Sequence, residues 1–429
     1  MLCLTDGWWF AYVVRMIFDN PFLPLSAHRS VSVAHGAGPY SNARRALEHL
    51  DLSVARGRRV LLKPNAGRVA PPESGVTTHP EVVAAAIDAF KEVGADVAVG
   101  ESPIAGVNVH EAFEVTGIAA IAKERDCPLL DMDRRPCVEV SIPKGGAIHS
   151  LQVCPEVLES DLLVSIPVMK MHMHTGVTLA VKNMKGCLWR RSKVQLHMLP
   201  SIEGSDLKPL DVAIADMSSV LRPHLAIIDG SVGMEGLGPS AGRARRAGVV
   251  VVGADAFSAD AVACRLMGTQ AEAIPHLRIG SERGCGVIDL ERIAVSPENW
   301  RDWIVPFSPP PCNLTIEFPN ITVLDNNSCS ACQSTLLLFL TSYKDRLFDY
   351  FPPGTPVHIA IGKGHKELPE GTLCIGNCMA NHKARGLFVP GCPPVTSGIL
   401  AALSGKPSVD TADGRHTASD KERLDASFQ

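Results

Sequence analysis

Strand-like and helix-like patterns alternate along residues 29–300 of this chain, and this alternation restricts the fold more than any other feature. The apolar runs Arg59–Leu62 and Ala95–Val99 are separated by an amphipathic pattern from His79 to Val93. Parallel strands need a crossover element between them, so the alternation predicts an α/β fold with a mainly parallel, helix-covered sheet. The same patterns predict strands at Val31–Val33, Asp161–Ile166 and Leu225–Asp229, and helices at Asn42–Leu50 and Val109–Arg125.

The chain is long enough for two domains. At 429 residues it exceeds the size at which a single hydrophobic core keeps growing. The prolines at Pro309–Pro311 prevent regular strand pairing and stiffen the chain, and strand-like and helical patterns resume beyond them. We therefore expect a second, smaller α/β domain that carries a cysteine cluster. The expected divisions are an N-terminal extension without regular structure at residues 1–28, a first domain at 29–300, a cysteine-rich domain at 312–403 and a disordered polar tail at 404–429.

Composition and charge argue against several classes of protein. Thirteen cysteines in 429 residues are too sparse and irregular for a secreted disulfide scaffold, so we expect reduced thiols and a cytoplasmic location. The formal net charge is −4 and the basic residues are scattered, so no nucleic-acid partner is expected. The apolar run Trp8–Val14 is too short to cross a bilayer and lacks a signal-peptide cleavage site, so no transmembrane segment is expected. Gly36-Ala37-Gly38 lacks the third glycine of a dinucleotide-binding loop, so neither NAD nor ATP is supported.

Polar residues follow the predicted strands of the first domain. Lys63, Glu101 and Asp229 stand at or just after three strand ends, and Lys170 follows a fourth. Ligands of open parallel sheets bind beyond the carboxyl ends of the strands, so we expect a cleft there. The catalytic candidates are Lys63, His172, His174, Lys182 and Glu235, and the substrate-binding candidates are Asn65, Glu101, Lys170, Asn183 and Asp229.

The stretch Lys170–Gly186 has the highest density of these candidates. His172 and His174 are two residues apart, so an extended backbone points both to one side, as two ligands for a metal ion or for proton transfer would point. An equally weighted alternative is that one histidine only bonds a backbone carbonyl. Lys182 and Lys185 stand close together and can hold a carboxylate or a phosphate, or can simply be solvated.

Two further acidic residues are expected to have different kinds of role. Glu235 lies in the glycine-rich segment Gly233–Gly238, which we predict to be a loop because backbone freedom explains its glycines. Its carboxylate is either an acid/base group or cation ligand, or a solvated loop residue. Asp255 precedes a predicted helix and is well placed to be its N-cap, which is a structural role.

Five cysteines in the C-terminal part of the chain lie within or after apolar, strand-like runs. Four thiolates can hold a [4Fe-4S] cluster, and we assign as its ligands Cys329, Cys332, Cys378 and Cys392. Cys374 is the alternative ligand, although it lies within the apolar run Leu373–Ile375 and can be only a small buried residue. Zn2+ is the rival metal, because the same residues suit a tetrahedral structural site.

Short motifs between Val31 and Gly286 form an ordered set. They include Lys63-Pro64-Asn65, Thr77–Val83, Gly100–Pro103, Lys170–Gly186, Asp229-Gly230, Gly233–Gly236, Asp260–Val262 and Ile274–Leu277. Together they resemble the family known as domain of unknown function 362 (DUF362). Many members of that family carry iron–sulfur clusters, so the resemblance implies the fold and a cluster, but no general activity. The turn Gly391–Pro394 is similar to the cluster-binding turn in the small subunits of nickel–iron hydrogenases, where dispersed cysteines on a flavodoxin-like sheet hold one four-iron cluster.

These features lead to three functional hypotheses. The first is an iron–sulfur oxidoreductase that passes electrons between a [4Fe-4S] cluster and a small-molecule substrate in the N-terminal cleft, with a separate electron-transfer partner. The second is an acid/base or metal-dependent enzyme of the lactate-racemase type, in which paired histidines move protons and the cluster or zinc is structural. The third is a non-enzymatic electron carrier.

Overall fold

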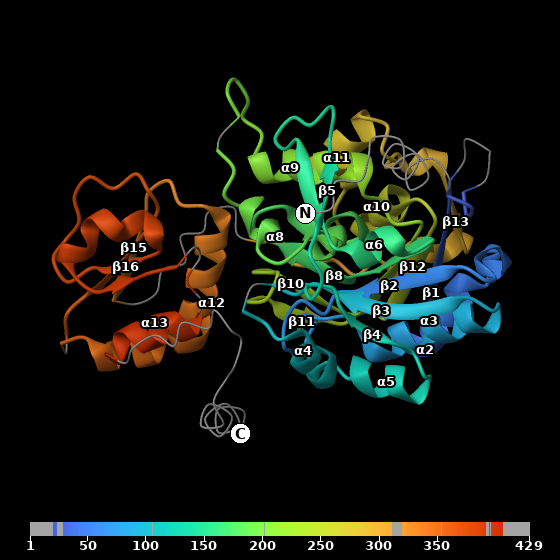
Figure 1. Ribbon diagram of the computed structural model, residues 1–429, viewed down its shortest axis with the longest axis horizontal. Coiled ribbons are helices and arrows are strands. Elements are labelled where there is room, and N and C mark those ends of the chain that lie inside the picture. Colours follow the sequence, from blue (N-terminus) through green and yellow to red (C-terminus); the bar gives the residue numbers. More distant parts are fainter. Residues whose placement is uncertain are drawn as a thin grey trace. The chain divides into compact units, whose positions relative to one another are not determined.

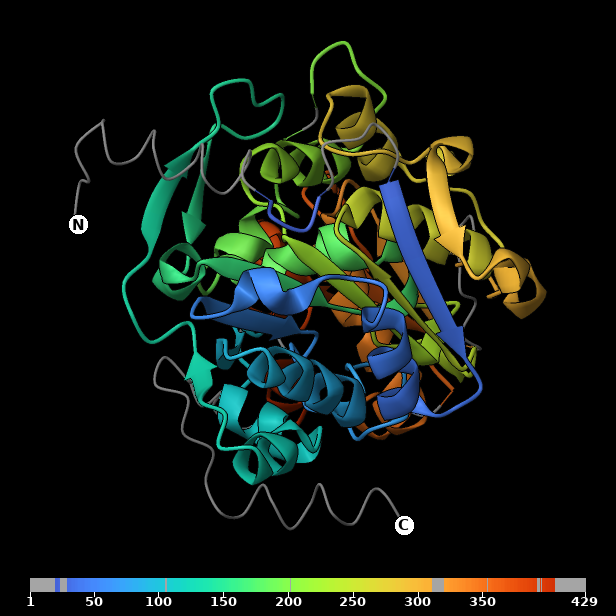
Figure 2. The same ribbon diagram turned by 90° about the vertical axis from the view of Figure 1, so that its right-hand side faces the viewer.

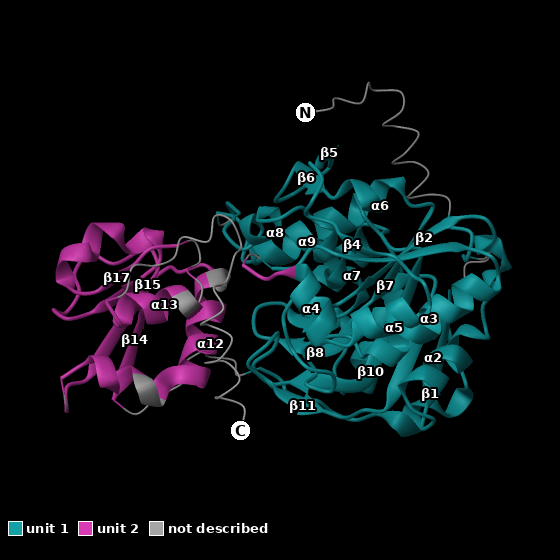
Figure 3. Ribbon diagram, turned by 60° about the horizontal axis from the view of Figure 1, so that its bottom comes forward, with its two compact units in different colours: residues 1–105, 109–314 teal, residues 106–108, 315–429 magenta. Residues whose placement is uncertain are grey.

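The computed structural model describes residues 20–23, 29–104, 106–200, 202–310, 320–352, 354–391, 394 and 396–405. The chain forms two compact units, unit 1 with residues 1–105 and 109–314 and unit 2 with residues 106–108 and 315–429 (Figure 3). Within the described residues each unit has its own β-sheet and its own hydrophobic cores.

The sheet of unit 1 confirms the predicted, mainly parallel architecture. Its main path runs in the order β13-β1-β12-β10-β7-β2-β3-β4, and β12 is the strand that runs antiparallel to both of its neighbours. Figure 2 shows β1, in blue, beside its parallel partner β13, in gold. The strands of this path are β1 (Arg29–His35), β2 (Arg59–Pro64), β3 (Asp96–Glu101), β4 (Leu129–Asp131), β7 (Leu162–Ile166), β10 (Leu225–Glu235), β12 (Val249–Gly253) and β13 (Ile293–Ser296).

Three short strands extend this sheet next to β10. They are β8 (Val168–His172), β9 (Gly176–Thr178) and β11 (Arg243–Arg245), and β8 and β9 form an antiparallel hairpin. A separate two-stranded sheet consists of β5 (Val138–Ser141) and β6 (Ser150–Val153).

Helices cover both faces of the sheet, because consecutive strand residues face opposite cores. Leu61 of β2 packs in one core, whereas its neighbours Val60 and Leu62 pack in the other. In Figure 1, α2, α3 and α5 lie on one side of the sheet and α9 and α11 on the other. The helices of unit 1 are α2 (Pro39–Leu47), α3 (Pro80–Glu92), α4 (Val109–Val115), α5 (Ile118–Glu124), α6 (Pro155–Glu159), α7 (Ala180–Asn183), α8 (Ser192–Gln195), α9 (Pro209–Val220), α10 (Ala256–Leu266) and α11 (Pro275–Glu282).

The single helix predicted at Val109–Arg125 is wrong, because the structure has two helices, α4 and α5. Gly117 separates them with a left-handed φ of 78°. The Thr116 hydroxyl donates to the Ala112 carbonyl at 2.7 Å, and a side chain at Gly117 would press on the ring of Pro80 at 3.3 Å. Helical periodicity alone carries no sign of this break, since the apolar spacing continues across it.

The loop predicted at Gly233–Gly238 is also wrong in its first half. Strand β10 continues to Glu235 and pairs with both β8 and β11. At Gly233 an added Cβ would overlap the Met169 carbonyl oxygen of β8. Close backbone approach, rather than turn freedom, therefore explains this glycine, whereas Gly236 does adopt a left-handed φ of 74°.

A short part of the expected N-terminal extension is ordered against unit 1. The Asn20 amide donates to the carbonyls of His224 and Ala254 at 2.9 and 3.0 Å, and Phe22 is buried edge-on against Phe90. Residues 1–19 and 24–28 lie outside the described residues.

Unit 2 is the second, smaller α/β unit that the sequence predicts. Its four parallel strands follow one another in chain order, and α12 (Ser330–Leu347) and α13 (Thr396–Leu403) supply residues to the larger of its two cores. The strands are β14 (Ile321–Asp325), β15 (Val357–Ile361), β16 (Leu373–Ile375) and β17 (Phe388–Val389). The predicted tail is described only to Gly405.

Candidate functional site

Lys63 and Glu101 form a buried ion pair at the carboxyl ends of β2 and β3. The ammonium and a carboxylate oxygen lie 2.8 Å apart, and each side chain is 2% exposed. Lys63 also donates to the Pro64 carbonyl at 2.7 Å and to the Asn183 amide oxygen at 3.2 Å. Glu101 accepts the backbone N–H groups of Ala66 and Ser102 at 2.9 and 3.0 Å. This pair is therefore hydrogen-bonded on both sides, as a buried ion pair must be to persist.

Gly186 closes over this ion pair. It belongs to the short 3-10 turn Met184–Cys187, and a Cβ at this position would overlap the Glu101 carboxylate and the end of the Lys63 side chain. The Gly186 carbonyl accepts the Ser102 N–H at 3.2 Å. Only glycine allows the turn to pack this closely.

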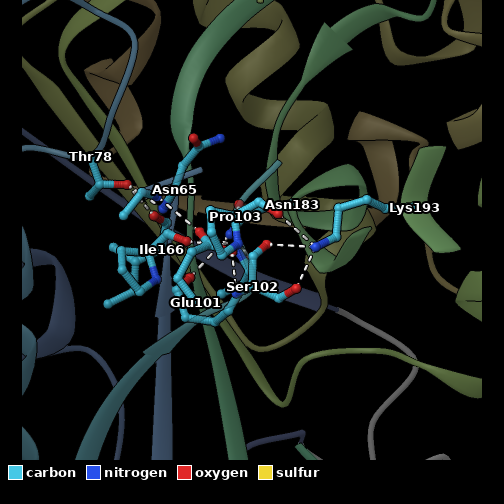
Figure 4. Close-up of polar contacts among 12 residues, drawn as sticks. Asn65, Thr78, Glu101, Ser102, Pro103, Ile166, Asn183 and Lys193 are labelled. Atoms are coloured by element: carbon cyan, nitrogen blue, oxygen red, sulfur yellow. Dashed lines mark hydrogen bonds and ion pairs between the residues drawn. The ribbon is translucent and has the colours of Figure 1, made fainter. Parts of the chain in front are cut away.

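Two further predicted residues brace the loop between β2 and α3. The backbone N–H of Asn65 donates to the Thr78 hydroxyl at 2.8 Å, and that hydroxyl donates to the Ile166 carbonyl at 2.6 Å (Figure 4). Asp229 accepts the N–H of His79, the N-cap of α3, at 2.8 Å and that of Ser231 at 2.9 Å. Burial raises the pKa of Asp229. Its carboxylate thus holds backbone in place at the start of α3.

Lys193 of α8 joins this network although no sequence pattern singles it out. Its ammonium donates to the carbonyls of Ser102 and Pro103 at 3.0 and 2.8 Å and also contacts the Ser102 hydroxyl (Figure 4). That hydroxyl donates to Asp133 at 2.5 Å. Burial lowers the pKa of Lys193.

The β8–β9 hairpin brings Lys170 and Lys182 to the same residue, Thr178. Lys170 of β8 is the register partner of Thr178 in β9, and the Lys182 ammonium donates to the Thr178 hydroxyl at 3.2 Å. The Lys170 ammonium donates to the carbonyls of Val76 and Pro239. The two lysines are 3% and 6% exposed, respectively. Burial lowers the pKa of Lys170 to about 7 and lowers that of Lys182 well below its ordinary value.

The two predicted histidines are neighbours, and a third lies near them. The Nδ1 atom of His172 accepts the His174 backbone N–H at 3.1 Å, and the two ring centroids are 5.7 Å apart. The Lys185 ammonium lies 2.5 Å from Nε2 of His197, a residue that the sequence did not suggest. Burial lowers the pKa values of His172 and His197, and the charges of Lys182 and Lys185 lower both further.

Asn183 and Asp260 fix the short helix α7 that carries Lys182. The Asn183 amide donates to the Lys63 carbonyl and to the Ser165 hydroxyl, both at 3.1 Å. Asp260 is fully buried and accepts the N–H groups of Ala180 and Val181 at 2.7 and 3.0 Å, and burial raises its pKa to about 8. The predicted N-cap role of Asp255 is confirmed by its bonds to the backbone at the start of α10.

Glu235 has different surroundings from the other candidates. As the last residue of β10 it accepts the Ser308 N–H at 3.0 Å, and this bond lowers the pKa of its carboxyl. Arg243 and Arg245 lie 3.6 and 4.0 Å from the carboxylate. Glu235 therefore connects the end of β10 to β11 and to the backbone of Ser308.

In unit 2, three chain segments that carry or adjoin the candidate cysteines meet at the carboxyl edge of the sheet. The Gly391 N–H donates to the Asn377 amide oxygen at 2.7 Å, and the Asn377 N–H donates to the Gly391 carbonyl at 2.8 Å. A Cβ at Gly376 would lie 3.4 Å from the sulfur of Cys332. The segment after β14, the turn after β16 and the turn after β17 therefore converge. Cys392 lies outside the described residues.

The remaining candidate cysteines differ in their surroundings. Cys329 is half-buried just before α12, and Cys378 is exposed after β16. Cys374 packs in the small core with Ala360 and Met379, on the opposite face of the sheet from the core that contains Cys332. Among the residues that the structure describes, no three His, Cys, Asp or Glu side chains are grouped as a metal site.

Part of this chain matches a known protein family, and two known proteins align with the chain. Residues 60–265 match the family model described as Domain of unknown function (DUF362). The thylakoid-associated protein sll1697 of Synechocystis sp. is 28% identical over 231 residues, which are 52% of this chain and 67% of that protein. The lactate racemase apoprotein from Thermoanaerobacterium thermosaccharolyticum aligns with a TM-score of 0.37 and 13% identity, covering 86% of this chain and 80% of that one.

The DUF362 match contains every predicted site residue of unit 1, from Lys63 to Glu235, and none of the cysteines of unit 2.

No helix in the described part of the chain is both long and apolar enough for a bilayer span. The structure brings seven of the unit 1 candidates into two adjoining groups and leaves Asn65, Asp229 and Glu235 outside them. One is the Lys63–Glu101 pair with Asn183, and the other, which we call the lysine–histidine cluster, consists of Lys170, His172, His174, Lys182, Lys185 and His197.

Proposed function

We propose that this protein is an iron–sulfur oxidoreductase in which unit 2 holds a [4Fe-4S] cluster and unit 1 binds a small-molecule substrate at the lysine–histidine cluster. One observation carries the proposal. The turns around Cys332, Asn377 and Gly391 converge at one edge of a parallel sheet, and this is the arrangement that dispersed cysteine ligands need.

The donor set fits a cluster better with Cys378 than with Cys374. Cys329 and Cys332 flank the start of α12, where helix N–H groups favour thiolate charge. Cys378 follows the same strand end whose Gly376 contacts Cys332, whereas Cys374 faces the opposite core. The cluster ligands in this proposal are therefore Cys329, Cys332, Cys378 and Cys392. A cluster bound there would supply one-electron transfer.

The residues of unit 1 have roles that the geometry suggests. Since Nδ1 of His172 accepts an N–H, its neutral ring carries the proton on Nε2, and this nitrogen can donate to a substrate. Lys170, whose pKa burial lowers to about 7, is an amine that can hold or move a proton near neutral pH, and burial also lowers the pKa of Lys182. The Lys63–Glu101 pair, closed by Gly186, positions Asn183 and α7 beside them.

Metal analysis of the anaerobically purified protein tests the proposal. Iron, sulfide and zinc are measured together with the visible spectrum for wild type, Cys332→Ala, Cys378→Ala and the matched control Cys374→Ala. We expect about four irons and four sulfides per chain and a broad absorption that bleaches on reduction. Cys332→Ala and Cys378→Ala should lose both, and Cys374→Ala should keep them. Stoichiometric zinc without colour would instead make unit 2 a structural module.

A proton-transferring enzyme is the second candidate, and the adjacent rings of His172 and His174 favour it. In this case the metal site in unit 2 is structural, and the histidines exchange a substrate proton without net oxidation. Potentiometric titration of the purified protein separates the two. A cluster that can be neither reduced nor oxidised in the physiological range would favour the proton-transferring enzyme.

A further inference from the structure

The lysine–histidine cluster of unit 1 groups several basic side chains in a buried place. Lys170 and Lys182 meet at Thr178, and Lys185 lies three residues beyond Lys182, which puts both on one side of the helical segment. Lys170 and Lys182 are almost fully buried, while Lys185 is half-buried.

The hydrogen-bond partners of these three ammonium groups are neutral. They are the carbonyls of Val76 and Pro239 for Lys170, the Thr178 hydroxyl for Lys182 and the His197 ring for Lys185. Within the described residues no carboxylate forms an ion pair with any of the three. The ion pair of unit 1 next to them, Lys63–Glu101, is complete in itself.

Among the described residues, the acidic side chains in this part of unit 1 form no ion pair with these three lysines. Asp229 and Asp260 accept backbone N–H groups at the starts of α3 and α7. Asp211 acts on Lys182 only through space, and its carboxylate lies 3.5 Å from the ring of His276. The protein thus supplies more buried cations here than anions.

Such an excess is unfavourable unless a ligand compensates it. A buried ammonium without a counter-charge either loses its proton or is matched by an anion. Burial lowers the pKa values of Lys170 and Lys185 to about 7, so both amines regain full charge easily when an anion arrives.

We infer that unit 1 binds the oxyanion of its substrate, a carboxylate or a phosphate, between the ammonium groups of Lys170, Lys182 and Lys185. The inference rests on the proposed substrate site and names the chemical class of its ligand. Lysines bind either oxyanion as point charges, so the two classes share this recognition. The histidine rings can then contact the rest of the substrate.

Isothermal titration calorimetry on the full chain tests this inference. Inorganic phosphate and malonate are titrated separately at neutral pH and constant ionic strength into wild type, Lys182→Met, Lys185→Gln and Lys144→Gln. Lys144 is an exposed lysine of the same unit and serves as the matched control. We expect saturable binding of at least one probe to wild type and to Lys144→Gln, with the Kd raised at least ten-fold in the other two variants. The probe that binds more tightly identifies the oxyanion class.

Two results would overturn the inference: neither probe binds, or the Lys182→Met and Lys185→Gln variants bind as tightly as Lys144→Gln. Lys185 is half-buried, so its variant keeps the test valid if Lys182→Met fails to fold. Iron and sulfide are measured on the same samples. Anion binding without iron contradicts the proposed cluster alone, and iron without anion binding contradicts this inference alone.

Discussion

At the scale of single residues, the lysines of unit 1 show how surroundings separate side chains of one type. Lys63 is paired with Glu101 and donates to two neutral oxygens, whereas Lys170 and Lys182 have neutral partners only. The first arrangement stabilises the fold, because both charges are satisfied. The second leaves groups whose charge a ligand can match, so we assign lysine a structural role in one place and propose a binding role in the other.

Breaking the Lys63–Glu101 pair should be strongly destabilising. Lys63→Met leaves the Glu101 carboxylate buried without its counter-charge, and we expect the free energy of unfolding to fall by about 3–5 kcal/mol. The comparison is Arg59→Met, which removes the more exposed ion pair with Asp161 and should cost less than about 1 kcal/mol. Urea unfolding of both variants measures the difference. Equal losses would contradict the structural role assigned to the buried pair.

Gly186→Ala should destabilise the same region by overpacking. The added methyl group would overlap the Glu101 carboxylate and the Lys63 side chain, so we expect a loss of about 1–3 kcal/mol. Gly67→Ala is the matched control, since its nearest neighbours would be 4.0 Å away, and it should change stability by only about 0.5 kcal/mol. Thermal unfolding of the two variants checks this, and a Gly186→Ala variant as stable as wild type would show that the turn moves freely.

Lys185 should react with amine reagents near neutral pH. Its pKa of about 7 makes most of the amine neutral at a pH slightly above 7, whereas an ordinary lysine with a pKa of about 10.4 is almost wholly protonated there. We expect Lys185 to be acylated at least about ten-fold faster than the exposed Lys144, and the rate to fall as the pH drops below 7. Mass spectrometry of briefly labelled protein gives both rates. Labelling of Lys185 no faster than that of Lys144 would refute the lowered pKa.

At the scale of elements, the sequence predicts the positions of strands better than it predicts where helices and strands end. The apolar runs at Arg59–Leu62 and Asp161–Ile166 became β2 and β7 because burial on both faces gives a continuous apolar signal. The break at Gly117 and the extension of β10 to Glu235 were missed, since both depend on contacts with distant residues. Lys193 and His197 joined the site through tertiary packing, for which the sequence carries no local pattern.

Asp260→Ala should loosen α7 and the residues it carries. The N–H groups of Ala180 and Val181 would lose their acceptor inside the protein, and each orphaned buried donor costs about 1–3 kcal/mol. The control is Asp51→Ala, which removes an N-cap on an exposed turn and should be less destabilising. Because α7 carries Lys182, the Asp260→Ala variant should also bind oxyanions more weakly, as calorimetry can show. Unchanged stability would mean that α7 is held by other contacts.

At the scale of the whole molecule, the candidate site residues are divided between two units with separate cores. The candidate residues of unit 1 could be predicted because they follow strand ends, and the structure assigns several of them to bracing the fold. The cysteines of unit 2 stay a prediction as a ligand set, which rests on the glycine, asparagine and proline that surround them. The structure was needed to show which cysteines lie on the same face of the sheet, because Cys374 and Cys332 pack in different cores.

Removing the proposed cluster should therefore change the stability of unit 2 and leave unit 1 almost unaffected. All five tryptophans fall within the residues of unit 1, so tryptophan fluorescence reports its unfolding alone, while visible absorbance reports a bound cluster. A group that binds only the folded state stabilises that state by mass action. We expect oxidative chelation to abolish the visible transition and to lower the midpoint of one of two transitions seen by circular dichroism, with the fluorescence midpoint unchanged.

Two variants serve as controls. Cys332→Ala should reproduce this pattern without chelation, and Cys374→Ala should retain the visible transition. A fluorescence midpoint that falls together with the visible one would mean instead that the two units unfold as one.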